Sequence, residues 1–292
     1  MGNTRTIQTL ENADLLRLEK LARTIRVDII EMLSASGSGH AGGSLGVADI
    51  MTVLYFHVLV HDPKKPMWSG RDRFLLSNGH VCPARYVAMA HAGYFSKKIL
   101  GTLRQFKSPL QGHPERTFLP AVENTSGPLG DGAAQSVGLA YLAKTESLPW
   151  RTYCLLSDGE LETGIVWESA LFASKNSLDN LTWIIDRNGI QIDGNTEDIV
   201  PLEPLREKFE SFGFEVIESD GHNIRDLSDA CGLAASTRDR PTVIIAHTIS
   251  GKGVRYMERD YRWHGAVPGT GPDDKVPKSK QKAHALIDLK TI

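Results

Sequence analysis

The sequence predicts an α/β protein in which a doubly wound parallel sheet is flanked by helices. The chain has 292 residues with 41% hydrophobic content, which is enough to bury a sizeable core. Short and nearly continuous apolar runs recur along it, and each ends at a polar or glycine-containing turn. Helical patterns lie between these runs, and this alternation is typical of parallel strands that are covered on both faces.

The first elements expected are two helices and one strand-like run. Apolar residues three or four positions apart predict a helix over residues 15–33. A second, largely buried helix is expected over residues 47–59. The segment RDRFLLSNGH, residues 71–80, then supplies a short apolar run that ends in a turn at Asn78-Gly79.

Four further apolar runs predict strands, and helical patterns separate them. The runs are YCLLSDGE (153–160), LTWIIDRNG (181–189), FEVIESDGHN (214–223) and TVIIAHTI (242–249). The helices are expected over residues 133–144, 165–175, 202–212 and 224–235. We assign residues 1–265 to one domain. Residues 266–292 begin poor in apolar residues, so we expect a surface extension that ends in a short helix.

Charge and cysteine content narrow the class of function. There are 33 Lys and Arg against 35 Asp and Glu, a net charge of -2, which favours neither nucleic acid nor a membrane surface as partner. The sequence shows no apolar signal core and no run near the roughly 18 apolar residues of a membrane span. Cys82, Cys154 and Cys231 are widely spaced and form no C-x-x-C pair, so we expect free thiols and a cytoplasmic protein. Small-molecule chemistry is the resulting expectation.

The segment SASGSGHAGGSLG, residues 34–46, contains a formal match to the dinucleotide pattern G-x-G-x-x-G. That pattern must follow a strand, whereas this segment follows the helix expected over residues 15–33. A nicotinamide-dependent dehydrogenase is therefore a remote alternative, and Gly43 stands where a P-loop needs lysine. We interpret the segment as a turn between two helices whose backbone passes close to the active site, with His40 as a candidate substrate contact.

Two polar residues end consecutive predicted strands. Asp158-Gly159 closes one run, and Asn188 closes the next run 30 residues later. If the strands are neighbours, a carboxylate and an amide oxygen meet at the carboxyl edge of the sheet, where α/β proteins bind ligands. Such hard oxygen ligands suit Mg²⁺, and the N-terminus of the helix expected from Ile165 favours a diphosphate. The alternative is that both motifs only form turns that end strands.

Asp158-Gly159 and Asn188 also resemble the thiamine diphosphate signature, which is G-D-G followed at a distance by N. Eight segments occur in the order of the transketolase family: SGSGHAGGSLGVADI, RDRFLLSNGH, LQGHPE, TSGPLGDGAAQSVGLA, SDGELETGIVWESALFAS, LTWIIDRNGIQIDG, SDGHN and RWHG. From about residue 15 to 265 the chain resembles the N-terminal, diphosphate-binding half of transketolase. It is most similar to the separately encoded N-terminal subunits of split transketolases.

The resemblance implies the positions of the site residues. It assigns Mg²⁺ to the side chains of Asp158 and Asn188 and to the backbone carbonyl of Ile190. It assigns thiamine diphosphate to His80, Gly127, Pro128, Leu129, Gly130, Asp158, Gly159, Glu160 and Asn188. Four matched histidines, which can move protons near neutral pH, would line the cofactor and substrate channel: His40, His80, His113 and His264. The other six histidines receive no such role, and we expect His222 simply to finish a turn.

The resemblance also implies an enzyme that works with a second chain. In transketolases, the glutamate that activates the cofactor and the arginines that hold the sugar phosphate lie in a pyrimidine-binding domain that this sequence lacks. The implied activity is transfer of a two-carbon ketol unit from a ketose phosphate to an aldose, in an α₂β₂ heterotetramer with the C-terminal subunit. Alternatives are an enzyme for a branched-chain or sulfonated sugar and a non-catalytic subunit that carries the cofactor.

Two positions depart from the family pattern. Ser157 stands where the signature begins with glycine, and Thr163 replaces the usual glutamate of the E-L-x-E-G segment. In the family, that glutamate belongs to a carboxylate network between the two cofactors. Glu162 and Glu168 lie nearby, and Glu168 matches another member of the network. Thr163 therefore removes one carboxylate from the network that the resemblance implies.

Overall fold

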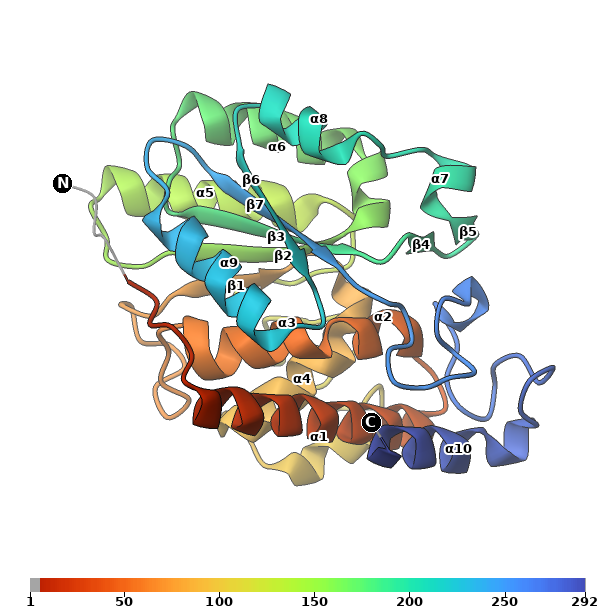
Figure 1. The fold of residues 1–292 in the computed structure, drawn as a ribbon. Coiled ribbons are helices and arrows are strands. Elements are labelled where there is room, and N and C mark those ends of the chain that lie inside the picture. Colours follow the sequence, from red (N-terminus) through yellow and green to blue (C-terminus); the bar gives the residue numbers. More distant parts are fainter. Residues whose placement is uncertain (1–5, 292) are drawn as a thin grey trace.

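The computed structural model describes residues 6–291, and in this range five parallel strands form the central sheet in the order β1-β2-β3-β7-β6 (Figure 1). The strands are β1 (Arg73–Leu76), β2 (Thr152–Ser157), β3 (Leu181–Arg187), β6 (Glu215–Asp220) and β7 (Thr242–His247). A small antiparallel pair follows β3, formed by β4 (Ile190–Gln191) and β5 (Gly194–Asn195). All five apolar runs are strands of one parallel sheet, so the predicted fold class is confirmed.

Helices cover both faces of the sheet (Figure 1). One face carries α5 (Asp131–Thr145), α6 (Gly164–Lys175) and α8 (Leu205–Ser211). The other carries α3 (Ala48–Val53), α4 (Cys82–Ala92) and α9 (Ile224–Ser236), with α1 (Asn12–Ser36) and α10 (Lys278–Thr291) outermost. Shorter elements are α2 (Ala41–Gly46), α7 (Thr196–Ile199), a π turn (Leu54–Val58) and 3₁₀ turns at Gly79–Val81, Lys97–Thr102, Asp158–Glu162 and Tyr261–Trp263.

The strands separate two apolar cores because successive side chains point to opposite faces. Tyr153 and Leu155 of β2 pack into the core shared with α1, α3 and α9. Cys154 and Leu156 pack into the core shared with α5, α6 and α8. Both faces are thus buried, which explains why these strands are apolar without alternation.

The helix predicted over residues 15–33 is α1, and it ends at Gly37. Gly37 has a φ of +65° and donates its N–H to the carbonyl of Leu33 at 3.0 Å, an arrangement that favours glycine. Four residues later α2 begins, so the predicted turn between helices is confirmed but occupies only residues 37–40. The helix predicted over residues 47–59 is α3 with its π turn.

Residues 266–292, expected to form a surface extension that ends in a short helix, end in α10, and one face of this helix is buried. The helix α10 lies on the outside of α1 (Figure 1), but Gln281, Ala285 and Leu289 are at most 2% exposed. Ala285 and Leu289 belong to the same core as α1. Gln281 also accepts the N–H of Gly269 at 2.9 Å, which ties the start of the tail to its helix. The tail is a packed layer, while the first five residues of the predicted domain and residue 292 lie outside the described range.

The structure of residues 6–291 also bears on the cysteines and on membrane-spanning helices. Cys82, Cys154 and Cys231 are all buried and unpaired with one another, so the prediction of free thiols is confirmed. None of the helices in this part of the chain is long and apolar enough to cross a lipid bilayer.

Candidate active site

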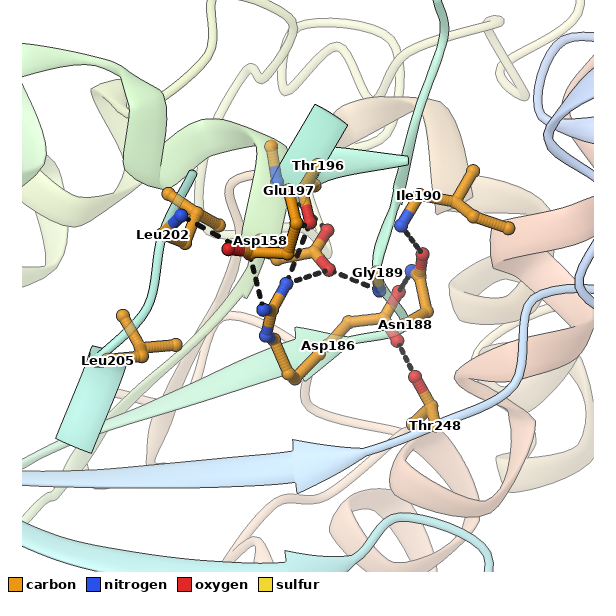
Figure 2. Close-up of polar contacts among 12 residues, drawn as sticks. Asp158, Asp186, Asn188, Gly189, Ile190, Thr196, Glu197, Leu202, Leu205 and Thr248 are labelled. Carbon is orange, nitrogen blue, oxygen red and sulfur yellow. Dashed lines mark hydrogen bonds and ion pairs between the residues drawn. The ribbon is translucent and has the colours of Figure 1, made fainter. Parts of the chain in front are cut away.

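The carboxyl ends of β2 and β3 bring two predicted ligands to one edge of the sheet. These strands are parallel neighbours, so the condition on which the predicted site depends is met. Figure 2 shows Asp158 and Asn188 in the loops that follow them. Asp158 is fully buried, and its Oδ1 accepts the N–H of Gly159 at 2.9 Å while its Oδ2 accepts the N–H of Gly189 at 2.6 Å. Backbone groups of both loops therefore fix this carboxylate.

Asp186 is a second buried carboxylate at the same edge (Figure 2). It accepts the Nδ2 of Asn188 at 2.8 Å and also accepts the hydroxyl of Thr248. The Oδ1 of Asn188 accepts the N–H of Ile190 at 3.0 Å, and a second lone pair remains on that oxygen for another ligand. The structure thus brings together Asp158, Asn188 and Ile190, the three residues predicted to bind Mg²⁺.

The charge balance of this edge suits a cation. Burial raises the pKa of Asp158 to about 6 and, together with the Asp158 charge, that of Asp186 to about 7. The Arg187 guanidinium lies 3.3 Å from Asp158, 2.7 Å from Glu197 and 2.8 Å from Glu203, so one cation serves three carboxylates. The excess negative charge and the hard oxygen donors fit a divalent ion such as Mg²⁺.

A metal site made only of carboxylate, imidazole or thiolate ligands would differ in composition from the predicted set. Between residues 6 and 291 no three or more His, Cys, Asp or Glu side chains gather in a way that could hold a metal ion. The predicted set differs because it combines one carboxylate, one amide oxygen and one backbone carbonyl. Such a set leaves coordination positions for water and for substrate phosphate oxygens, as Mg²⁺ usually requires.

Glu160 is expected to contact the cofactor, but its side chain is fully buried. Its Oε1 accepts the hydroxyl of Ser77 at 2.6 Å and the N–H of Gly130 at 2.8 Å. Its Oε2 accepts the N–H of Ser157 at 2.9 Å. Burial raises the pKa of this carboxyl, although the donors oppose the shift. These hydrogen bonds tie the glycine loop to Ser77 and to Ser157, at the ends of β1 and β2, so the Glu160 side chain positions the loop.

The loop of Gly127, Pro128, Leu129 and Gly130 leads into α5. Gly130 has a φ of +83°, and a Cβ added there would lie 2.5 Å from Ile165 and 2.6 Å from Thr163. A side chain at this position would therefore be strained in its backbone and would also collide with α6. At the other end of the loop, Gly127 lies beside the ring of His113. The loop thus connects the Asp158 region with a group of histidines.

The four predicted histidines form one cluster although they span positions 40 to 264. The ring centroid of His40 lies 5.1 Å from that of His80, 6.3 Å from that of His113 and 5.7 Å from that of His264. The rings of His80 and His264 are 4.8 Å apart. They come from the residue before α2, the turn after β1, a loop and the end of a 3₁₀ turn. The structure therefore brings all four together.

Burial keeps these imidazoles uncharged. It lowers the pKa of His40 to about 4, with His264 and Arg104 as further causes, and lowers the pKa of His80 well below its usual value. Burial also lowers the pKa of His113 and His264. The Nδ1 of His40 is buried and has no hydrogen-bond partner among the described residues. Neutral imidazoles with a free nitrogen can take up a proton or hydrogen-bond a ligand.

Two cavities open beside these groups. One of about 570 Å³ is lined by His113, Arg104 and Phe118. The other, of about 520 Å³, is lined by Asn188, His222 and neighbouring residues. Both volumes lie in the range of small-molecule sites. A further cavity of about 410 Å³ lies by the start of β2 and β3 and includes none of the predicted site residues.

Sequence reasoning missed residues that hold the site together. Ser77 bonds to Glu160, Thr248 bonds to Asp186, and Arg187 joins Asp158 to the segment after β5. Ser77 and Thr248 each directly follow the last residue of a strand, β1 and β7, so their position at the carboxyl edge was a signal that could have found them.

These features define a class of protein. An α/β domain that presents a carboxylate, an amide oxygen, a glycine loop and uncharged histidines at the carboxyl edge of a parallel sheet can hold a phosphorylated cofactor with a divalent cation beside a centre for proton transfer.

Comparison with known proteins identifies the family. The family profile "Transketolase, thiamine diphosphate binding domain" matches residues 18–284. The chain is 38% identical over 251 residues to one subunit of the apulose-4-phosphate transketolase of Phocaeicola vulgatus, covering 86% of this chain and 89% of the relative. It is 39% identical over 241 residues to 6-deoxy-6-sulfo-D-fructose transketolase subunit SqwG of a Clostridium species, covering 82% and 88%.

Solved structures agree with these relatives. Transketolase from Leishmania mexicana superimposes with a TM-score of 0.82 at 31% identity, over 94% of this chain and 44% of that one. This chain belongs to the transketolase family and comprises its thiamine diphosphate-binding domain. The family match continues past residue 265, in keeping with the packed tail.

Proposed function

We propose that this chain is the N-terminal subunit of a split transketolase that transfers a two-carbon ketol unit from a ketose to an aldose. We further propose that it binds Mg²⁺ with thiamine diphosphate, works in the cytoplasm and forms an α₂β₂ heterotetramer with a C-terminal subunit. One observation carries the proposal. The four histidines lie together at the glycine loop whose other end is held by Glu160, two residues from Asp158.

One group of residues in this chain would hold the metal ion and the cofactor. Asp158, Asn188 and the carbonyl of Ile190 would hold Mg²⁺, and the backbone at Gly159 and in the 127–130 loop would approach the diphosphate. Thiamine diphosphate, when bound, supplies the carbanion that attacks the ketose carbonyl and stores charge.

The histidines would then act on the sugar. His80, the most strongly shielded of them, would lie towards the diphosphate, while His40, His113 and His264 face the sugar. Their lowered pKa values keep them neutral at pH 7, so each can accept a hydroxyl proton or donate a hydrogen bond to a substrate oxygen.

The relatives suggest which sugars to test. Two of them are named for apulose 4-phosphate and for 6-deoxy-6-sulfo-D-fructose. A branched-chain sugar phosphate and a sulfonated sugar therefore belong in the substrate panel beside ordinary ketose phosphates. The residues that choose among them are expected in the partner chain.

An apolar surface supports the need for a partner. The large side chains Tyr141, Leu142, Leu171 and Phe172 of α5 and α6 are 41 to 61% exposed, and the rings of Tyr141 and Phe172 lie 5.4 Å apart. Leu129 of the glycine loop, which leads into α5, is also 46% exposed. Contiguous exposed apolar side chains are typical of protein interfaces. We propose that this face, near the C-terminal ends of α5 and α6, binds the pyrimidine-binding subunit.

The test is reconstitution with the candidate partner. The two chains are co-expressed, purified together and assayed with ketose donors and aldose acceptors, with and without thiamine diphosphate and Mg²⁺, using Asp158→Ala as the control. We expect transfer that depends on both chains and on the cofactor and is abolished by the substitution. A complex that binds the cofactor without transferring from any donor would favour the non-catalytic alternative, and binding of NADH would favour a dehydrogenase.

A further inference from the structure

His222, predicted only to finish a turn, is instead the centre of a buried hydrogen-bond chain. Its side chain is 10% exposed and lies between α3 and the segment after β7. The Nδ1 of His222 lies 2.8 Å from Oδ2 of Asp49, and the Nε2 accepts the backbone N–H of Ile249 at 2.8 Å. Because Nε2 must carry the lone pair, Nδ1 carries the proton and donates it to Asp49. The ring is thereby fixed in one tautomer and one orientation.

Asp49 is itself held rigidly. It is 5% exposed, and its Oδ1 accepts Nη1 of Arg26 at 3.1 Å, while the second guanidinium nitrogen binds Oδ2. The Nε of Arg26 donates to the carbonyl of Leu45 at 3.1 Å. The chain of contacts therefore runs from α1 through α3 to His222, and all of its members are firmly packed.

The segment that His222 holds, residues 248–251, touches both halves of the active site. At one end, the hydroxyl of Thr248 donates to Asp186, beside Asn188. At the other end, the N–H of Gly251 donates to the carbonyl of Gly42 at 2.8 Å.

Close packing against α2 explains two glycines of the segment that carries His40. A Cβ added at Gly42 would lie 2.5 Å from Oγ of Ser250, and one added at Gly46 would lie 3.1 Å from the carbonyl oxygen of Ile249. A side chain at Gly42 would require the Ser250 side chain to shift, and one at Gly46 would press on the backbone of Ile249. The spacing between α2 and this segment is therefore set by direct contact.

We propose that His222 is a positioning residue for the active site. By accepting the N–H of Ile249, it fixes residues 248–251 so that Thr248 orients the Asp186–Asn188 loop while Gly251 supports the segment that carries His40. The catalytic consequence rests on the proposed function, but the positioning itself does not. Both ring nitrogens of His222 are engaged by Asp49 and by the N–H of Ile249, so in this role it acts through the 248–251 segment.

Three variants of the full chain test this proposal. His222→Phe removes the acceptor for Ile249, whereas His222→Gln offers a carbonyl oxygen and an N–H to the same two partners. His91→Phe is the matched control, because its buried ring also binds a carboxylate, Asp28 at 2.7 Å, but lies elsewhere. Hydrogen–deuterium exchange of the peptide containing residues 248–251 is measured for each variant, along with the Kd for thiamine diphosphate in the presence of Mg²⁺.

We expect His222→Phe to speed exchange in residues 248–251 by about 2- to 10-fold, because one hydrogen bond is lost. The Kd for thiamine diphosphate should rise by a similar factor. His222→Gln should restore most of both properties. His91→Phe should leave exchange at residues 248–251 unchanged.

Several results would overturn the proposal. These are unchanged exchange at residues 248–251 in His222→Phe, an equal increase throughout the chain, or no rescue by His222→Gln. If His222→Phe does not fold, Asp49→Asn disturbs the same ring through its other nitrogen and must give the same local increase. A local increase without any cofactor-dependent transfer in the reconstituted complex would uphold the positioning role and refute the proposed function.

Discussion

Replacing Gly130 by alanine should misplace the loop that leads into α5, and the cost can be worked from its geometry. Gly130 has a φ of +83°, which costs an L residue about 1–2 kcal/mol. The new Cβ would lie 2.5 Å from Ile165 and 2.6 Å from Thr163, and relieving such crowding costs about 1–3 kcal/mol. We therefore expect Gly130→Ala to lower the free energy of unfolding by about 2–5 kcal/mol.

The same substitution in α9 is a matched control. Gly232 has no heavy atom within 4 Å of an added Cβ and lies inside a regular helix. Alanine there should raise the free energy of unfolding by about 0.5–1 kcal/mol, because it restricts the unfolded chain and favours the helix.

Urea unfolding of the two variants gives the sign and size of each change, and calorimetric titration gives the Kd for thiamine diphosphate with Mg²⁺. Gly130→Ala should weaken binding, because the shifted loop can no longer keep its backbone close to the diphosphate, whereas Gly232→Ala should bind as the wild type does. If Gly130→Ala were as stable as the wild type, or were destabilised but bound the cofactor equally well, the role assigned to this loop would be refuted.

Three further predictions concern the metal site, the partner surface and the histidines. Asp158→Asn should keep the fold but weaken Mg²⁺ binding at least tenfold in titration calorimetry, since it removes the charged ligand. Leu171→Glu should reduce binding to the C-terminal subunit in sedimentation experiments, while Leu233→Glu, equally exposed on α9, should not; equal effects would contradict the proposed interface. Burial lowers the pKa of His40 from 6.5 to about 4, so its contribution to stability is complete above pH 6.5 and is lost as the pH falls towards 4. The free energy of unfolding should therefore depend less steeply on pH in His40→Asn over that range, and parallel curves would disprove this.

The parts of the fold that sequence reasoning found are those with a local physical cause. Strands buried on both faces are continuously apolar, so β2, β3 and β7 were recognisable from composition alone. Asp158 and Asn188 were recognisable because strand ends of a parallel sheet meet at one edge. The four histidines were found through family resemblance, since no local pattern connects positions 40 and 264.

The parts that it missed depend on tertiary contacts. The helix α4, Cys82–Ala92, is buried along almost its whole length, so it shows little of the amphipathic spacing that marks a surface helix. The role of His222 depends on Asp49, 173 residues away in the chain. Gln281 buries an amide that is satisfied by backbone groups of the tail, and composition alone makes such a residue look exposed.

Thr163 bears on coupling between two active sites because it stands where the family carries a glutamate of the carboxylate network. Its hydroxyl donates to the carbonyl of Glu160 at 2.7 Å, so the position that carries a glutamate in the family is here bound to the chain itself. Of the two nearby acids, Glu168 lies on α6, the helix that carries the apolar face, while Glu162 has a buried Oε1 without a partner among the described residues, and burial raises its pKa. For the proposed complex, we therefore propose that Glu162 and Glu168 carry any proton path between two active sites, together with groups that the partner supplies.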